Sequence, residues 1–277
     1  MEISPQGIPF NSTHREVVDR FLDACQADER IVAAFLSGSY ARGTADEFSD
    51  LDLNLIAADG DYAEILAERD DFVRNLGEPA FIEDFGNPDI LFYILTDGSE
   101  GELAFGRESS FGGVASGEFK VLLDKKGILA GAAFPKGRAN LEAQREESRR
   151  VITWFWHEMS HFITALGRGQ LWWAQGQLEA LRGHCVALAR LQYDFTDADA
   201  SDEPYFKIET AMPVEELEPL RGTFCSLERA EMLEAGMAVL QFYRETATTL
   251  TGAHGLPYPQ ALDRIMSKRL ENLQRRV

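Results

Sequence analysis

The chain has 277 residues, and its 46 Asp and Glu outnumber 27 Lys and Arg to give a formal net charge of −19. This excess of negative charge repels nucleic-acid backbones, so RNA and DNA are disfavoured as partners, whereas cationic small molecules are attracted. Apolar residues make up 45% of the sequence, enough for a buried core, and the length suits two modest domains. No apolar run approaches the roughly 20 residues that cross a bilayer, so no membrane partner is expected.

The cysteines and the first residues of the chain predict a cytoplasmic protein. Cys25, Cys185 and Cys225 are widely spaced and form neither a CxxC metal pattern nor a disulfide framework. Free thiols of this kind are typical of a reducing compartment. The N-terminal segment has no basic region followed by an apolar stretch, so it does not resemble a signal peptide. The choice between a monomer and a homodimer stays open.

The first half of the chain alternates helix and strand signals. Thr13 and Glu16 have the spacing of a capping box and predict a helix of about three turns. The apolar run Ile31–Leu36 predicts a buried strand, and Leu51–Ile56 alternates with a period of two. Tyr62–Leu76 is predicted to be a helix closed by a glycine. Further strands are predicted at Ala80–Ile82, Ile90–Thr96, Glu102–Phe105 and Phe119–Leu123. This half therefore predicts an α/β domain with a small mixed β-sheet.

Helical periodicity dominates the second half. The turn-forming segment Phe134–Gly137 marks the expected boundary between a first domain at residues 1–137 and a second at residues 138–277. The second domain is predicted to be an all-α helical bundle, with candidate helices at residues 140–166, 170–193, 214–222, 227–250 and 259–275.

The most informative motif joins a glycine–serine turn to two aspartates. The strand that ends at Leu36 runs into Gly38 and Ser39, and Asp50 and Asp52 follow within the apolar alternation. Residues two apart on a strand point to the same face, where two carboxylates repel each other unless a cation lies between them. Oxygen ligands suit magnesium, and two-metal phosphoryl transfer uses ions about 3.5–4 Å apart.

The turn itself has features of a phosphate site. Gly38 allows the backbone to approach a phosphate closely, and a helix that begins at Ser39 would offer free N–H groups and a hydroxyl donor. The alternative is that Asp50 and Asp52 form the solvated face of an edge strand beside an ordinary turn. The combination of strand, turn, spacing and Asp-x-Asp favours the functional interpretation.

These motifs resemble a known signature. The segments Gly38-Ser-Tyr-Ala-Arg42-Gly43 and Ser49-Asp-Leu-Asp52 are similar to the motif of the polymerase-β-like nucleotidyltransferases. The small antibiotic adenylyltransferases of that superfamily, which act on aminoglycosides or lincosamides, are most similar in size and layout. The resemblance implies an enzyme that moves a nucleoside monophosphate, expected to be AMP from ATP although another nucleoside triphosphate stays open, with two Mg²⁺ ions held in part by Asp50 and Asp52.

The resemblance also implies a third acidic residue on a later strand. Glu102 is the best match and would act as metal ligand, general base or both. Asp97 lies in a predicted turn and Asp89 follows Asn-Pro at a strand start, so both fit less well. Arg42 and Lys207 are candidate phosphate contacts, with an ordinary surface position as the alternative for each.

A second motif favours a different chemistry. His157 and His161 complete an H-E-x-x-H pattern on a predicted helix, which is typical of zinc metalloproteases. The two histidines share a face opposite the apolar stripe of that helix. The pattern has no supporting downstream signature, so zinc proteolysis stays a minor alternative.

Aromatic and acidic residues of the second domain form a candidate acceptor site. Trp154 and Trp173 lie away from the main apolar stripes of their helices, and Glu158 and Glu179 are expected nearby. Aromatic faces with carboxylates suit a cationic, sugar-like acceptor.

Together these features predict Mg²⁺-dependent nucleotidyl transfer to a hydroxyl of a small cationic acceptor, with an aminoglycoside such as streptomycin favoured by resemblance and charge. A lincosamide, another small metabolite or a protein side chain stays possible as acceptor. A non-catalytic nucleotide-binding module is the remaining alternative class.

Overall fold

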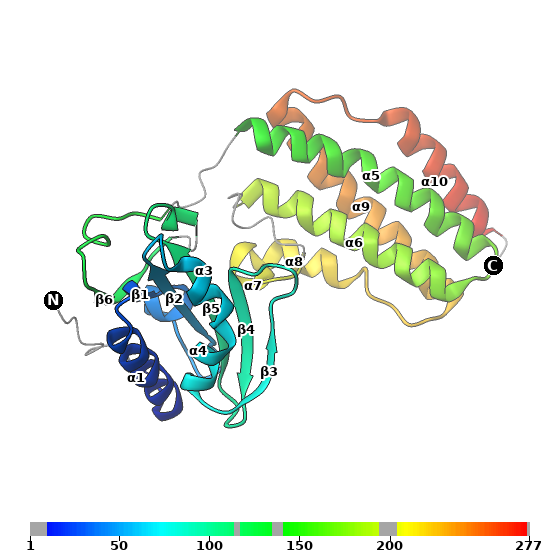
Figure 1. The fold of residues 1–277 in the computed structure, drawn as a ribbon. Coiled ribbons are helices and arrows are strands. Elements are labelled where there is room, and N and C mark those ends of the chain that lie inside the picture. The colour runs from blue at the N-terminus through cyan, green and yellow to red at the C-terminus, as the bar shows by residue number, and fades with distance from the viewer. Residues whose placement is uncertain (1–9, 114–116, 135–140, 194–203, 276–277) are drawn as a thin grey trace. The chain divides into compact units, whose positions relative to one another are not determined.

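The computed structural model describes residues 10–113, 117–134, 141–193 and 204–275 (Figure 1). The chain divides into two compact units, residues 1–137 and residues 138–277. Most of the predicted boundary segment, from residue 135 to Gly137, lies outside the described residues. The first unit is α/β and the second is helical, as the sequence predicts.

The first unit is built on a six-stranded sheet with the order β3-β4-β5-β2-β1-β6. Only β2 and β5 pair in parallel among the described neighbours, so the sheet is mixed, which confirms the prediction. The predicted strands are all present, each within about two residues of its expected ends. Their bounds are β1 Ile31–Leu36, β2 Leu51–Ala57, β3 Pro79–Glu83, β4 Ile90–Leu95, β5 Glu100–Arg107 and β6 Lys120–Asp124.

The helices of this unit depart from prediction at two points. Helix α1 begins at Ser12 because Asn11 caps it, its side chain accepting a hydrogen bond of 2.7 Å from the amide of His14. The expected cap at Thr13 is therefore wrong. The single helix expected over residues 62–76 is divided at Glu68, whose carboxylate binds Arg30 at 2.7 Å. The helices are α1 Ser12–Ala27, α2 Gly38–Arg42, α3 Tyr62–Ala67 and α4 Arg69–Leu76, with a 3₁₀ turn η1 at Phe111–Gly113.

The alternation of β2 separates a core from a polar face. Leu51, Leu53 and Leu55 are buried in the larger core of this unit, which also contains residues of α1, α3 and α4. Asp52 points to the opposite face, because successive side chains of a strand alternate. That second face is filled near β1 by a smaller apolar cluster around Phe35. The acidic residue of β2 is therefore left on the face that α1 and α4 do not cover.

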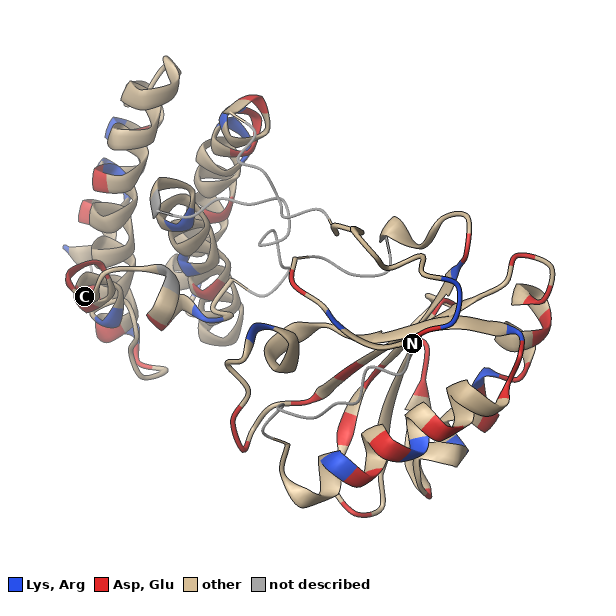
Figure 2. Ribbon diagram, turned by 90° about the vertical axis from the view of Figure 1, so that its left-hand side faces the viewer, with Lys and Arg blue, Asp and Glu red and all other residues tan. Residues whose placement is uncertain are grey.

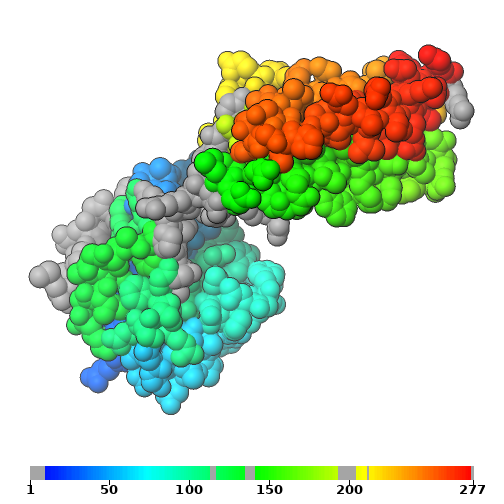
Figure 3. All heavy atoms as spheres, turned by 90° about the horizontal axis from the view of Figure 1, so that it is seen from above, coloured from blue at the N-terminus to red at the C-terminus, as the bar shows by residue number. Residues whose placement is uncertain are grey.

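The second unit is a bundle in which α5 packs on α6, and α6 packs on α9. Helix α10 lies beside α5 and α9 (Figure 3). The short helix α7 was not predicted. The helices are α5 Leu141–Gly167, α6 Leu171–Tyr193, α7 Ile208–Ala211, α8 Val214–Arg221, α9 Arg229–His254 and α10 Gln260–Gln274. Within the described ranges, no helix is long and apolar enough to span a membrane.

The apolar stripe of α5 forms one side of the bundle core. Its predicted members are all buried: Ile152, Phe155, Met159, Phe162 and Ile163. Trp156 is buried with them, whereas Trp154 is 47% exposed. The stripe therefore faces the other helices and leaves Trp154 on another side of α5.

Candidate functional site

The glycine–serine turn lies directly against Asp52. Strand β1 ends at Leu36, Ser37 precedes α2, and Gly38 has φ +63°, in the left-handed region that favours glycine. An ideal Cβ on residue 38 would overlap Oδ2 of Asp52 and lie 2.6 Å from its Cγ. A side chain at this position would therefore displace the carboxylate, so only glycine permits this close approach.

Hydrogen bonds hold the turn and β2 together. The amide of Ser37 donates to the carbonyl of Asp52 at 3.0 Å. The buried side-chain amide of Asn54 donates to Oγ of Ser37 at 2.9 Å and to the same carbonyl at 3.2 Å. These bonds fix the turn relative to Asp52 on two sides. Asn54 was not singled out in the sequence, although its place two residues after Asp52 puts it on the same face.

Parallel pairing brings the third carboxylate to the aspartates. Asp52 on β2 is the register partner of Glu102 on β5, and Asp50 lies just before β2. Partial burial of the Glu102 carboxyl group raises its pKa, and the negative charge of Asp50 raises it further. The three predicted acids are therefore gathered at one end of β2 and β5. Acidic residues recur along the strands and helices of this unit (Figure 2).

The two competing acids are engaged elsewhere. The carboxylate of Asp97 accepts from the amide of Ser99 at 2.9 Å and so closes the turn between β4 and β5. The carboxylate of Asp89 accepts from the hydroxyl of Tyr62 at 2.7 Å. Each of these two carboxylates therefore already has a hydrogen-bond partner within its own part of the sheet unit.

The hydroxyl of Ser39 is buried without a hydrogen-bond partner among the residues that the structure describes. A buried polar atom of this kind is rare in folded proteins unless a ligand or water binds it. Ser39 follows Gly38 in α2, and its side-chain oxygen is shielded from solvent in this structure. This orphaned donor agrees with the phosphate contact expected from the sequence.

The two cations predicted to contact the phosphates, Arg42 and Lys207, belong to different units of the chain. Arg42 is exposed at the end of α2. Lys207 belongs to the helical unit, where it is exposed and its Nζ lies 4.6 Å from the ring centroid of Phe206. Lys120, which the sequence did not reveal, donates from Nζ to the carbonyl of Tyr40 at 2.9 Å. Lys120 reaches this position because β6 pairs with β1, which sets Lys120 opposite Leu36.

A buried histidine–tyrosine pair supports α2 from α1. Nδ1 of His14 lies 2.5 Å from the hydroxyl of Tyr40, and the ring of Phe10 stacks on Tyr40 at 4.7 Å. Burial lowers the pKa of His14, and the charges of Asp97 and Asp50 partly oppose this. Burial also raises the pKa of Tyr40. His14 and Tyr40 each combine apolar packing with a polar contact. Local sequence patterns do not distinguish such residues from ordinary core residues.

A second buried tyrosine lies near the aspartates. Tyr93 on β4 is fully buried, and its hydroxyl has no hydrogen-bond partner within the described ranges. Burial raises the pKa of Tyr93, and the charges of Asp52 and Asp50 add to the effect. A Cβ on Gly101 would lie 2.8 Å from this hydroxyl, so the glycine makes room for it.

The candidate acceptor residues of the helical unit fall into two groups. Trp154 lies against His157 with ring centroids 5.1 Å apart, Trp173 lies against His161 at 5.9 Å, and Glu158 contacts His157. Glu179 belongs elsewhere: it pairs with the buried Arg182, and its second oxygen accepts from Tyr205 at 2.7 Å. Of the four candidate acceptor residues, all but Glu179 therefore lie against His157 or His161.

The turn against Asp52, the three gathered carboxylates, the mixed sheet and the helical bundle that follows define a nucleotidyltransferase of the polymerase-β-like type. The sequence model described as streptomycin adenylyltransferase matches residues 12–273, and the chain belongs to that family. Among solved structures, one match is an aminoglycoside 6-adenyltransferase from Bacillus subtilis, with 17% identity and a TM-score of 0.45. The alignment covers 96% of this chain and 99% of that one. No curated protein matches the sequence significantly.

Proposed function

We propose that this enzyme transfers AMP from ATP to a hydroxyl of an aminoglycoside, with streptomycin as the first acceptor to test. The observation that carries the proposal is the overlap between a Cβ on residue 38 and the Asp52 carboxylate. The Asp52 carboxylate, a side chain of the kind that binds metal ions, therefore lies beside the turn that would bind the phosphates. Membership in the streptomycin adenylyltransferase family supports the choice of acceptor class. The negative net charge of the chain favours a cationic acceptor.

The carboxylates fit magnesium. Asp50, Asp52 and Glu102 offer oxygen ligands, and the raised pKa of Glu102 reflects in part a repulsion from Asp50 that a cation would relieve. We propose that these three residues hold two Mg²⁺ ions. Bound magnesium would neutralise the triphosphate and the departing pyrophosphate.

The protein residues divide the remaining work. The backbone at Gly38 and the hydroxyl of Ser39 bind phosphate oxygens, and Arg42 and Lys120 supply positive charge near α2. Glu102 accepts the proton of the acceptor hydroxyl as the general base. The hydroxyl oxygen then bonds to the α-phosphorus as the bond to pyrophosphate breaks. Most of the rate enhancement comes from positioning and charge stabilisation.

We assign catalysis to residues 1–137 and acceptor binding to residues 138–277. In the helical unit, Trp154 and Trp173 would contact the sugar rings and Glu158 would pair with an ammonium group. Glu179 is left out of this proposal because Arg182 and Tyr205 already engage its oxygens. Lys207 stays a weaker candidate for a phosphate contact. A cytoplasmic location is proposed from the free thiols of the three cysteines.

A pyrophosphate-release screen of ATP and GTP against aminoglycosides and lincosamides, with mass spectrometry of the product, tests this function. We expect an adenylylated aminoglycoside only with ATP and magnesium. Asp50→Ala and Asp52→Asn should each lower the rate at least about 100-fold while the circular dichroism spectrum stays unchanged. Asp19→Asn, an exposed residue of α1, is the matched control and should retain full activity. Near-normal turnover in Asp52→Asn would rule out the proposed role of the turn.

A further inference from the structure

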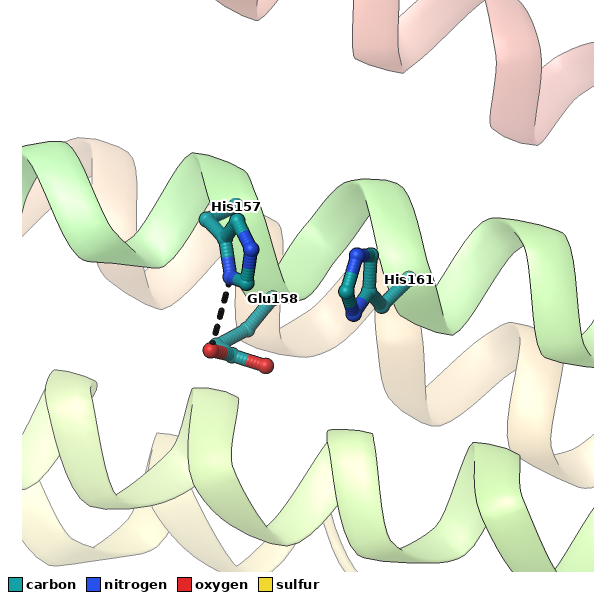
Figure 4. Close-up of side chains that lie close together, drawn as sticks. All are labelled: His157, Glu158 and His161. Atoms are coloured by element: carbon teal, nitrogen blue, oxygen red, sulfur yellow. Dashed lines mark hydrogen bonds and ion pairs between the residues drawn. The ribbon is translucent and has the colours of Figure 1, made fainter.

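One face of helix α5 carries a cluster of potential metal ligands, and it includes Glu158, which is also proposed above to pair with an ammonium group of the acceptor. The ligand atoms of His157, Glu158 and His161 all lie within 4.8 Å of one another (Figure 4). Nδ1 of His157 is 3.0 Å from Oε1 of Glu158, and the two imidazole rings are 4.4 Å apart between centroids. All three residues belong to the helical unit.

Helix geometry explains how these residues meet. His157 and His161 are four positions apart and so stand one turn above the other on the same side of α5. Glu158 is adjacent in sequence and would point away in an idealised wheel, but its side chain turns back to His157. Its side chain is only 15% exposed, whereas that of His157 is 51% exposed. The cluster therefore combines a partly buried carboxylate with an imidazole that solvent ions can reach.

The surroundings restrict the imidazoles and reduce contact with water. Trp154 lies edge-on against His157, and Trp173 from α6 lies against His161. His184, also on α6, is within electrostatic reach of Glu158, and burial lowers the pKa of His184. The lowered pKa of His184 favours its uncharged form, which reduces electrostatic repulsion of an incoming cation.

We propose that His157, Glu158 and His161 bind a zinc-class divalent cation. Two imidazole nitrogens and one carboxylate oxygen match the ligand types that zinc prefers, with at least one coordination position left for water. Ligands of a tetrahedral zinc ion lie about 3.3 Å apart at bond lengths of about 2.0–2.2 Å. The pair of His157 and Glu158 is already near that separation at 3.0 Å. The ligand atom of His161 lies within 4.8 Å of the other two, and we expect a side-chain rotation of His161 to complete the site.

The ordinary explanation is an exposed histidine pair with a local hydrogen bond to a neighbouring glutamate. In that case Glu158 would serve only to orient His157, and the cluster would not gather a metal. The two explanations differ in the number of zinc ions bound per chain and in whether binding depends on His161. The hydrogen bond that the described residues of this cluster show joins Glu158 to His157 and does not involve His161.

Calorimetric titration of the full chain with zinc chloride separates them. The buffer contains excess magnesium chloride to occupy the carboxylates of the sheet, and it contains neither nucleotide nor acceptor, so the outcome is independent of the transfer reaction. We expect one zinc per chain. His157→Ala, His161→Ala and Glu158→Gln should each weaken binding by more than about tenfold, the lower bound for losing even a supporting group. His254→Ala, at the end of α9, is the matched control and should bind as the unchanged protein does.

Tryptophan fluorescence gives a second readout. Nickel bound beside Trp154 and Trp173 should quench their emission in the unchanged protein and in His254→Ala, but not in His161→Ala. His161→Gln repeats the test with a side chain of similar size in case the alanine variant unfolds. A stoichiometry far below one zinc per chain, or unchanged affinity in both histidine variants, would overturn the site. Unchanged affinity in Glu158→Gln would overturn the three-ligand assignment.

Discussion

The carboxylate of Asp52 occupies the space that a side chain on residue 38 would need. Gly38 and Asp52 therefore depend on each other, because the turn can approach β2 only without a Cβ and the carboxylate is positioned by the bare backbone of the turn. This relationship makes the turn sensitive to the smallest possible substitution.

We expect Gly38→Ala to lower kcat/KM by about 100-fold, since displacing the carboxylate by about 1 Å misplaces the reacting groups. Gly43→Ala is the matched control. Gly43 also has a positive φ, +73°, but a Cβ there meets nothing within 4 Å. Both variants should lose about 1–2 kcal/mol of stability from backbone strain. Steady-state kinetics and urea unfolding measure the two effects, and equal activity of the two variants would contradict this account.

Ser39→Ala should weaken ATP binding without weakening the fold. The Ser39 hydroxyl is buried and has no partner among the described residues, so its removal takes away a desolvation cost and leaves the free energy of unfolding unchanged or higher. The KM for ATP should rise about fivefold, which corresponds to about 1 kcal/mol for one hydrogen bond.

Ser37→Ala provides the contrast. Its hydroxyl accepts from buried Asn54, so this variant should lose about 1–3 kcal/mol of stability. A loss of stability in Ser39→Ala of the same size would show that its hydroxyl is structural.

Glu102→Gln should stabilise the metal-free protein at neutral pH. Desolvation and then Asp50 raise the pKa of Glu102 in the folded state, so the folded chain holds this proton more tightly than the unfolded chain. The stability from the bound proton is fully present below the pKa of the unfolded chain and is lost as pH rises through the folded pKa. The difference in Tm between Glu102→Gln and the unchanged protein should therefore grow between pH 4 and pH 7. Thermal scans in EDTA measure it, and a difference independent of pH would contradict the raised pKa.

Tyr40→Phe should lower the free energy of unfolding by about 1–3 kcal/mol, because it leaves the buried Nδ1 of His14 without its partner. A double-mutant cycle with His14→Leu isolates the coupling between the two side chains. Additive losses in the double variant would show that the short contact contributes nothing to stability.

Local patterns predicted most elements of this fold because strands and amphipathic helices leave a period in the sequence. Ile31–Leu36 forms a strand with the predicted bounds, and the stripe of α5 is buried as predicted. The departures come from single polar contacts. Asn11 rather than Thr13 caps α1, and the pairing of Glu68 with Arg30 accompanies the break between α3 and α4. The capping residue depends on which of several neighbouring polar side chains reaches the helix amide. The break between α3 and α4 involves a partner, Arg30, that is distant in sequence.

The candidate site was only partly predictable for the same reason. The Asp-x-Asp motif and the turn are contiguous enough to be recognised, but the register of Asp52 with Glu102 belongs to a pairing of distant strands. Lys120 joins the turn through β6, and His14 meets Tyr40 through the packing of α1. Neither Lys120 nor His14 lies in a sequence pattern that distinguishes it from its neighbours.

The parallel pairing of β2 with β5 also has a consequence for how the protein is made. A ribosome releases β2 well before β5, and α3, α4, β3 and β4 must be synthesised between the two. Because pairing of distant strands requires closure of a long loop, β5 can join β2 only after the segment between them has been synthesised. A nascent chain that ends before Glu100 therefore contains Asp50 and Asp52 but lacks Glu102, the third acid proposed for the site.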